Sequence, residues 1–265
     1  MARRRKLKRT LLRRLLKNPR SAVRSIRDER FCVEFLDYCD AEVVSKPARG
    51  KYLAGIAVRL ATAIGNRCLR SRAFGVLLSA HRALGRYQFA ERTAEVAFSI
   101  APDCIDCRCD LWFRLAHLRS EQGFIDAALT EINKVLRVCA DRRDKNGEGR
   151  AYFLRGVIYD RAGNRTFAKT DLSKALTLIS PDRSPQYHSA ALNSLVIVLS
   201  SGSAEEFRVA LKLFPSVLKL YKGKRGLTAE RAKLKWVRLF LIRRFTSVCR
   251  CHVGHLLVSH LTSLR

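Results

Sequence analysis

The sequence predicts an all-α protein, a right-handed solenoid of about four antiparallel helix hairpins. Its 265 residues are rich in Ala, Leu and Arg and include only 6 prolines. That composition favours helices, because these side chains lose little rotamer freedom in a helix. A pattern also recurs along the chain at spacings of 38 and 40 residues, and in each copy a glycine is followed five residues later by an alanine. A single hairpin leaves an apolar side uncovered, so we expect the copies to stack on one another.

Residues 1–45 are predicted to form a basic helical N-terminal segment. Residues 1–30 hold 13 Lys and Arg against 2 acidic residues, and the first helix is broken near Asn18-Pro19. In this segment, cations lie opposite an apolar stripe. The segment could pack on the array, lie on an acidic surface or bind RNA phosphates. The stripe consists of Leu11, Leu12, Leu15 and Leu16.

Residues 46–226 are predicted to form the repeat array. A glycine ends the first helix of each hairpin by adopting a left-handed conformation at little cost. Small residues then lie where the second helix crosses the first, and a larger side chain there would push the two helices apart. The glycines are Gly85, Gly123 and Gly163, the alanines five positions later are Ala90, Ala128 and Ala168, and the small residues seven positions further are Ala97, Val135 and Ala175.

The flanks of the array are degenerate copies of the repeat. Residues 51–65 read as a second helix without a clean partner, and residues 185–221 contain Gly202 but lack the alanine at the matching offset. The polar stretch DRRDKNGE at 141–148 is interpreted as a long loop that ends in a helix N-cap.

The array resembles the tetratricopeptide repeat family over residues 51–221, most clearly over 71–182. Longer-period arrays of this kind look like the sensory or scaffolding halves of some bacterial regulators. The third copy matches the family's Gly, Tyr, Ala and Ala positions, and the second copy matches its Trp position and its first Ala position. The matching residues are Gly156, Tyr159, Ala168 and Ala175 in the third copy, and Trp112 and Ala128 in the second.

The resemblance implies that the first helix of each hairpin lines a concave groove. Such a groove could hold an extended or helical peptide, with Arg72, Arg82 or Arg150 binding a carboxylate. The alternative is that these positions are ordinary solvated helix faces. The implied inward positions are Arg72, Gly75, Ser79 and Arg82, then Asp110, Phe113, His117 and Ser120, then Arg150, Phe153, Val157 and Asp160.

Nine cysteines, an odd number, suit a reducing compartment better than a disulfide framework. Three of them, Cys104, Cys107 and Cys109, lie in PDCIDCRCD, which we place in the link between two hairpins. The next such link begins near Cys139, and with that residue they could bind zinc through four thiolates. Because C-x-x-C-x-C supplies only half of such a site, we favour buried apolar roles for Cys109 and Cys139, with the other two as free loop thiols.

Residues 227–265 are predicted to form a basic C-terminal helix and an atypical tail. Residues 208–265 hold 14 Lys and Arg against a single acidic residue, whereas residues 31–207 are nearly balanced. The tail also contains Cys249, Cys251 and His252, but its cationic surroundings disfavour a divalent metal ion.

We expect the chain to be a non-enzymatic scaffold that binds a protein or peptide partner. We also expect it to be cytoplasmic and to resemble bacterial proteins of this kind. No phosphate-binding loop, nucleophile elbow or metalloprotease motif occurs, so we expect neither catalysis nor a cofactor. No apolar run reaches the roughly 18 residues that span a bilayer. The net charge of +29, concentrated at the two ends, supports the alternative of a nucleic-acid-binding protein.

Overall fold

The computed structural model describes residues 2–101 and 104–221, and this part of the chain forms twelve α-helices and no strand. None of these helices is long and apolar enough to cross a membrane. The first six helices are α1 Ala2–Lys17, α2 Pro19–Ser25, α3 Glu29–Ser45, α4 Pro47–Ile64, α5 Arg67–Ala83 and α6 Tyr87–Ile100. The other six are α7 Ile105–Glu121, α8 Ile125–Asp141, α9 Lys145–Arg161, α10 Arg165–Leu178, α11 Pro185–Ser200 and α12 Ala204–Tyr221.

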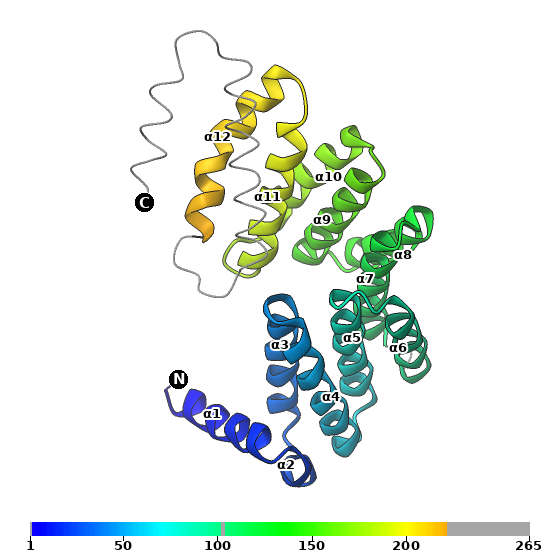
Figure 1. The fold of residues 1–265 in the computed structure, drawn as a ribbon, viewed down its shortest axis with the longest axis vertical. Coiled ribbons are helices and arrows are strands. Elements are labelled where there is room, and N and C mark those ends of the chain that lie inside the picture. The colour runs from blue at the N-terminus through cyan, green and yellow to red at the C-terminus, as the bar shows by residue number, and fades with distance from the viewer. Residues whose placement is uncertain (1, 102–103, 222–265) are drawn as a thin grey trace.

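From α3 onward the helices form a repeat-like array. Each odd-numbered helix packs against the even-numbered helix that follows it, which makes five helix pairs from α3/α4 to α11/α12. We call the odd-numbered member of a pair its first helix. Successive first helices also contact one another, from α3 through α5, α7 and α9 to α11. Figure 1 shows the pairs following one another along an arc, so the all-α repeat prediction is confirmed, with five pairs where about four were expected.

The predicted turn glycines have the expected conformation. Gly85, Gly123 and Gly163 have φ angles of 68°, 87° and 75°, and each lies just after the first helix of its pair. The left-handed region costs glycine nothing because it has no Cβ. Arg143, between α8 and α9, also adopts a positive φ of 54°, and it is the only non-glycine residue in the described ranges to do so.

The small residues lie where helices come close, as predicted. The three alanines five positions after the glycines are fully buried, and so are Ala97 and Ala175. At Gly156 on α9, a Cβ would lie 2.8 Å from Cγ of Leu172 and 3.2 Å from the backbone oxygen of Ala168, both on α10. The two helices therefore cross too closely for a larger side chain at that position.

Side chains at several helix starts cap the backbone. The carboxylate of Asp28 accepts a hydrogen bond from the N–H of Phe31, and that of Asp144 accepts one from the N–H of Gly147. The Asp144 contact confirms the N-cap predicted in the polar stretch 141–148. The predicted long loop there is wrong: α8 runs to Asp141 and α9 begins at Lys145, because three residues suffice for the turn.

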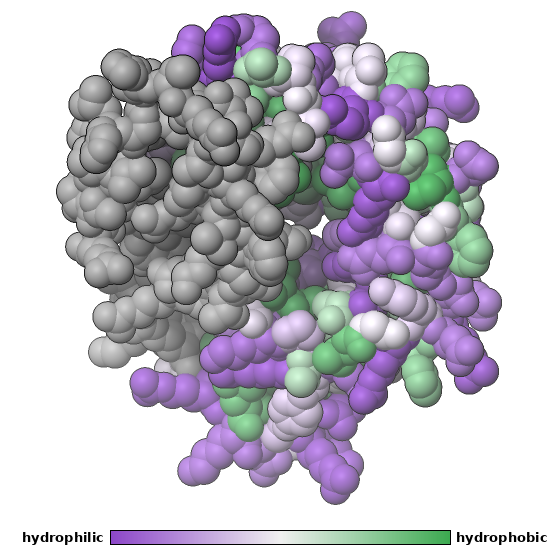
Figure 2. Space-filling view, turned by 45° about the horizontal axis from the view of Figure 1, so that its top comes forward, coloured by the Kyte–Doolittle hydropathy of each residue, from purple (hydrophilic) through white to green (hydrophobic). Residues whose placement is uncertain are grey.

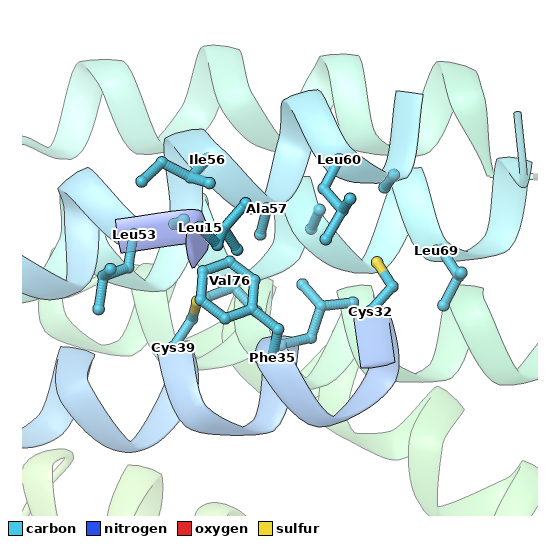
Figure 3. Close-up of a cluster of buried hydrophobic side chains, with 14 of the residues drawn as sticks. Leu15, Cys32, Phe35, Cys39, Leu53, Ile56, Ala57, Leu60, Leu69 and Val76 are labelled. Atoms are coloured by element: carbon cyan, nitrogen blue, oxygen red, sulfur yellow. The ribbon is translucent and has the colours of Figure 1, made fainter. Parts of the chain in front are cut away.

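The helix at residues 51–65 has a partner after all. It corresponds to α4, and it packs against α3, which lies inside the predicted N-terminal segment 1–45. Figure 3 shows side chains of α1, α3, α4 and α5 converging around Phe35. Leu15 of α1 is fully buried in this cluster, and the other three leucines of the apolar stripe pack against it. The stripe therefore packs on the array.

The degenerate copy at residues 185–221 also forms a pair, α11/α12. Phe207 occupies the position where the regular copies have alanine, and it is buried in a core shared with α10. The sequence PD at 181–182 lies in the turn between α10 and α11. The predicted basic helix and tail at 227–265 lie outside the described residues.

Candidate functional site

The predicted groove positions all lie on first helices. Arg72, Gly75, Ser79 and Arg82 are on α5, Asp110, Phe113, His117 and Ser120 are on α7, and Arg150, Phe153, Val157 and Asp160 are on α9. Because α5, α7 and α9 contact one another in order, residues of successive copies meet. We call the surface formed by the predicted positions and their contacts on α3 and α11 the first-helix face.

Arg114 of α7 forms the centre of an ionic network on this face. Its Nη1 and Nη2 donate hydrogen bonds of 2.8 and 2.7 Å to the two carboxylate oxygens of Asp40 on α3. Its Nε donates to Asp110 at 2.8 Å, and Nη1 also donates to the hydroxyl of Ser79 on α5 at 2.8 Å. One guanidinium thus connects three first helices. Opposite it lies Gly75, where a Cβ would come within 3.2 Å of the Arg114 side chain.

The network holds the Asp40 carboxylate in the ionised state. Burial by itself would raise the pKa of Asp40, but the adjacent Arg114 guanidinium lowers that pKa below its ordinary value. Burial would lower the pKa of Arg114, yet Asp110 and Asp40 raise it well above the usual range. These groups therefore act as fixed charges that organise the face, and they are unsuited to proton transfer near neutral pH.

A second ionic group lies at the other end of α5 and α7. Arg82 makes an ion pair of 2.5 Å with Glu121, and His117 Nε2 lies 3.5 Å from both partners. Arg161 of α9 reaches the same carboxylate at 3.7 Å and donates a hydrogen bond of 2.8 Å to Ser120. Of the three arginines expected to bind a ligand carboxylate, Arg82 is thus already paired.

Arg72 is also paired within the chain. Its Nη2 contacts the carboxylate of Asp37 on α3 at 2.5 Å, and the Asp37 side chain remains largely exposed. Asp160, at the end of α9, is exposed.

Three aromatic rings gather around Arg150. The ring of Tyr187 on α11 lies edge-on to those of Phe113 and Phe153, with centroids 6.2 Å apart in both cases. The Cζ atom of Arg150 lies 4.3 Å from the Tyr187 ring centroid and 5.5 Å from that of Phe113, and Nη2 donates a 3.1 Å hydrogen bond to the Tyr187 hydroxyl. These four side chains, which we call the Arg150 cluster, come from α7, α9 and α11 and are half-buried.

Two of the three cysteines of PDCIDCRCD lie on a helix, and only Cys104 lies in the predicted link. Cys104 is the N-cap residue of α7, and Cys107 and Cys109 lie in its first two turns. The helix begins at Ile105, so the expected link is confined to the residues before it. The structure brings Cys104 and Cys107 together with Cys68 of α5, a residue that the predicted set did not include.

Cys109 and Cys139 form a separate thiol pair. A hydrogen bond between the two thiols raises the pKa of Cys109 and lowers that of Cys139. Cys139 is buried in the core between α7, α8 and α9, as the sequence led us to expect, and Cys109 packs against the same core. The four predicted cysteines therefore divide between two places.

Three important residues of the face were missed by the sequence reasoning. Arg114 follows Asp110 by four residues, a spacing that pairs opposite charges on a helix and could have identified it. Tyr187 follows Arg150 by 37 residues, whereas the register from Gly163 to Gly202 places Ser189 at the position equivalent to Arg150, so the register would not have found Tyr187. Nothing local marked Asp40, which is 74 residues from Arg114.

Comparison with known proteins does not assign the chain to a family. No protein-family model matches the chain, and no curated protein is similar to it.

Proposed function

We propose that the chain is a non-enzymatic scaffold that binds an acidic peptide segment of a partner protein along its first-helix face. The proposal includes the finer description of the fold as a right-handed solenoid of antiparallel, tetratricopeptide-like hairpins, whose first helices line the concave side. It also includes the reducing cytoplasm that the odd number of cysteines favours.

The Arg150 cluster is the observation that carries this proposal. It combines three aromatic rings and a guanidinium at a half-buried position shared by three successive first helices. Aromatic residues and arginine are enriched among the hot spots of protein interfaces, where the rings bury a large area and the guanidinium forms directional hydrogen bonds. An extended or helical peptide that crosses successive helices would meet these side chains in turn.

Arg150 is the arginine best placed to bind a carboxylate of that peptide. Arg72 and Arg82 are neutralised by Asp37 and Glu121, whereas no carboxylate in the described ranges lies within ion-pair distance of Arg150. Its Nε is buried and has no hydrogen-bond partner among the described residues. Because that atom is closed to solvent, a ligand carboxylate would bind the other N–H groups of the half-buried guanidinium through charge-assisted hydrogen bonds.

Replacing Arg150 with alanine should weaken peptide binding by about 30-fold, which corresponds to the loss of about 2 kcal/mol at an interface hot spot. Short acidic peptides would be selected by display against the full chain, and their dissociation constants measured by fluorescence anisotropy. Arg137→Ala is the matched control, since Arg137 is exposed on α8 and its loss changes the net charge equally. Selected peptides that bind Arg150→Ala as tightly as the original chain, or a failure to select any peptide, would contradict the proposal.

A second candidate function, nucleic-acid binding, is favoured by the surface of α1 and α2. The apolar stripe of α1 packs inward on the core, and Arg13, Arg14 and Lys17 of the same helix are exposed. This arrangement offers phosphate contacts, and the four packed leucines are not available for insertion into a membrane. Figure 2 shows that hydrophilic residues predominate on the described part of the visible face. The exposed cations of α1 and α2 include Arg13, Arg14, Lys17, Arg20 and Arg24.

If these cations bind duplex nucleic acid, replacing Arg13, Arg14 and Lys17 with glutamine should reduce the slope of log K against log[salt] by roughly 0.9 for each cation removed. A variant that lacks three other exposed cations, Arg92, Arg137 and Arg183, should leave the slope unchanged. Point substitutions are preferable to deleting the segment, because deletion would also remove the buried Leu15. The absence of binding at low salt, or equal slopes in both variants, would eliminate this candidate.

A further inference from the structure

Three thiols lie close together where α5 and α7 begin. The sulfur atoms of Cys68, Cys104 and Cys107 are all within 4.8 Å of one another. Each of the three side chains is half-buried, so the cluster remains accessible from solvent while its shape is held by the fold. It is the only group of three or more potential metal ligands among the residues that the structure describes.

The cluster is produced by the packing of two helix N-termini. Cys104 is the N-cap of α7 and Cys107 lies in its first turn, whereas Cys68 is the second residue of α5. Because α5 and α7 are neighbouring first helices, their starts bring the three thiols together. The positive ends of both helix dipoles point toward the sulfurs, which favours negative charge at this position.

We propose that Cys68, Cys104 and Cys107 bind a soft d10 metal ion, Zn²⁺ or Cu⁺, as three thiolates. Thiolates are the ligands that these ions select. Three sulfurs bound at about 2.3 Å from a zinc ion lie about 4 Å from one another, which is compatible with the spacing observed. Three thiolates around a divalent or monovalent ion leave the complex with a net negative charge. Arg67 and Arg70 flank Cys68 in the sequence and Arg108 follows Cys107, so these cations can offset that charge.

The ion would join two successive repeats. Cys68 belongs to the α5/α6 pair and the other two cysteines to the α7/α8 pair, so binding would cross-link the array at that junction. This inference does not depend on peptide binding, because the cluster uses no residue of the Arg150 cluster. Only the folded chain brings the three ligands together, so metal binding would also raise the free energy of unfolding.

The test is metal binding by the full chain, reduced and freed of metal. Zn²⁺ and Cu⁺ would be titrated separately in competition with chromophoric chelators, and Co²⁺ would serve as a probe because thiolate coordination produces charge-transfer absorption. We expect one ion per chain for at least one of the two metals, and a higher unfolding temperature with that ion. Cys68→Ser and Cys104→Ser should each weaken binding by more than about 100-fold, beyond the loss typical of outer-shell changes.

Two controls separate this site from other thiols of the chain. Cys109→Ser tests the four-cysteine set suggested by the sequence, and the double variant Cys249→Ser, Cys251→Ser tests the tail; both should retain the affinity of the original chain. The proposal is overturned if neither ion binds, if Cys68→Ser binds as tightly as the original, or if Cys109→Ser loses binding to the same extent. Circular dichroism would show that each variant has kept its helices.

Discussion

Replacing Phe35 with alanine is expected to lower the free energy of unfolding by about 4 kcal/mol, within the range for truncating a buried phenylalanine. The ring is only 2% exposed and stacks on Phe31 and Tyr38, with centroid distances of 6.1 and 6.4 Å. It lies in the cluster that joins α1, α3, α4 and α5, so the cavity would open at the junction between the basic N-terminal helices and the array. Urea unfolding followed by circular dichroism measures the change.

Phe124→Ala is the matched control for this prediction. Phe124 precedes α8 and is 57% exposed, so its loss should change stability by less than about 0.5 kcal/mol. A loss of less than about 1 kcal/mol in the free energy of unfolding is typical of an Ile→Val substitution. If Phe35→Ala caused so small a loss, α3 would not share the core that the structure assigns to it.

Replacing Arg114 with methionine is expected to cost about 3 kcal/mol of stability, the lower end of the range for breaking a buried ion pair. The Arg114 side chain is 11% exposed, and it neutralises both Asp40 and Asp110. Methionine has a similar length but offers no hydrogen-bond donor, so both carboxylates would remain in a poorly solvated position without a cation. Their partial exposure keeps the expected cost at the lower end. The free energy of unfolding would be measured at neutral pH and low salt.

The same variant should show a characteristic dependence on pH. The pKa of Asp40 is lower in the folded chain than its ordinary value of 3.8, so this carboxylate stabilises the fold above that pH. That contribution is lost as the pH falls below about 4 and passes through the folded pKa. The difference in stability between the original chain and Arg114→Met should therefore be largest near neutral pH and shrink in acid. A difference that stays constant from neutral pH to acid would show that lost packing, not lost charge, accounts for the effect.

Arg208→Ala provides the comparison with a surface pair. Arg208 contacts Glu205 at 3.1 Å, but both side chains are more than 70% exposed. Solvent screening limits such pairs, so the loss should stay under about 0.5 kcal/mol. If this substitution and Arg114→Met cost the same, the three-helix network would have no special role in the fold.

The pairing of helices could be predicted from the sequence because its determinants are local. Gly85, Gly123 and Gly163 end their helices through a backbone conformation that only glycine adopts freely, and the alanine five residues later marks the crossing. Where these local signals were absent the prediction was weaker. Arg143 makes the same kind of turn without glycine, and no glycine lies between α3 and α4 to mark them as a pair.

The composition of the candidate sites could be predicted only in part. The repeat register placed Arg150, Phe113 and Phe153 on first helices, because residues one repeat apart occupy equivalent positions. It could not show that Arg72 and Arg82 are paired within the chain, since their partners lie on other helices and are separated from them by 35 and 39 residues.

By itself, the sequence determined the helices, the glycine turns and the register of the repeat, since each depends on residues a few positions apart. Only the tertiary structure decided which side chains meet between helices. Arg114 bonds to Asp40 from 74 residues away, and Cys68, not Cys139, joins Cys104 and Cys107. The physical reason is that such contacts depend on the rotation and crossing of neighbouring helices. Close packing of many side chains sets that geometry together, and no short stretch of sequence encodes it.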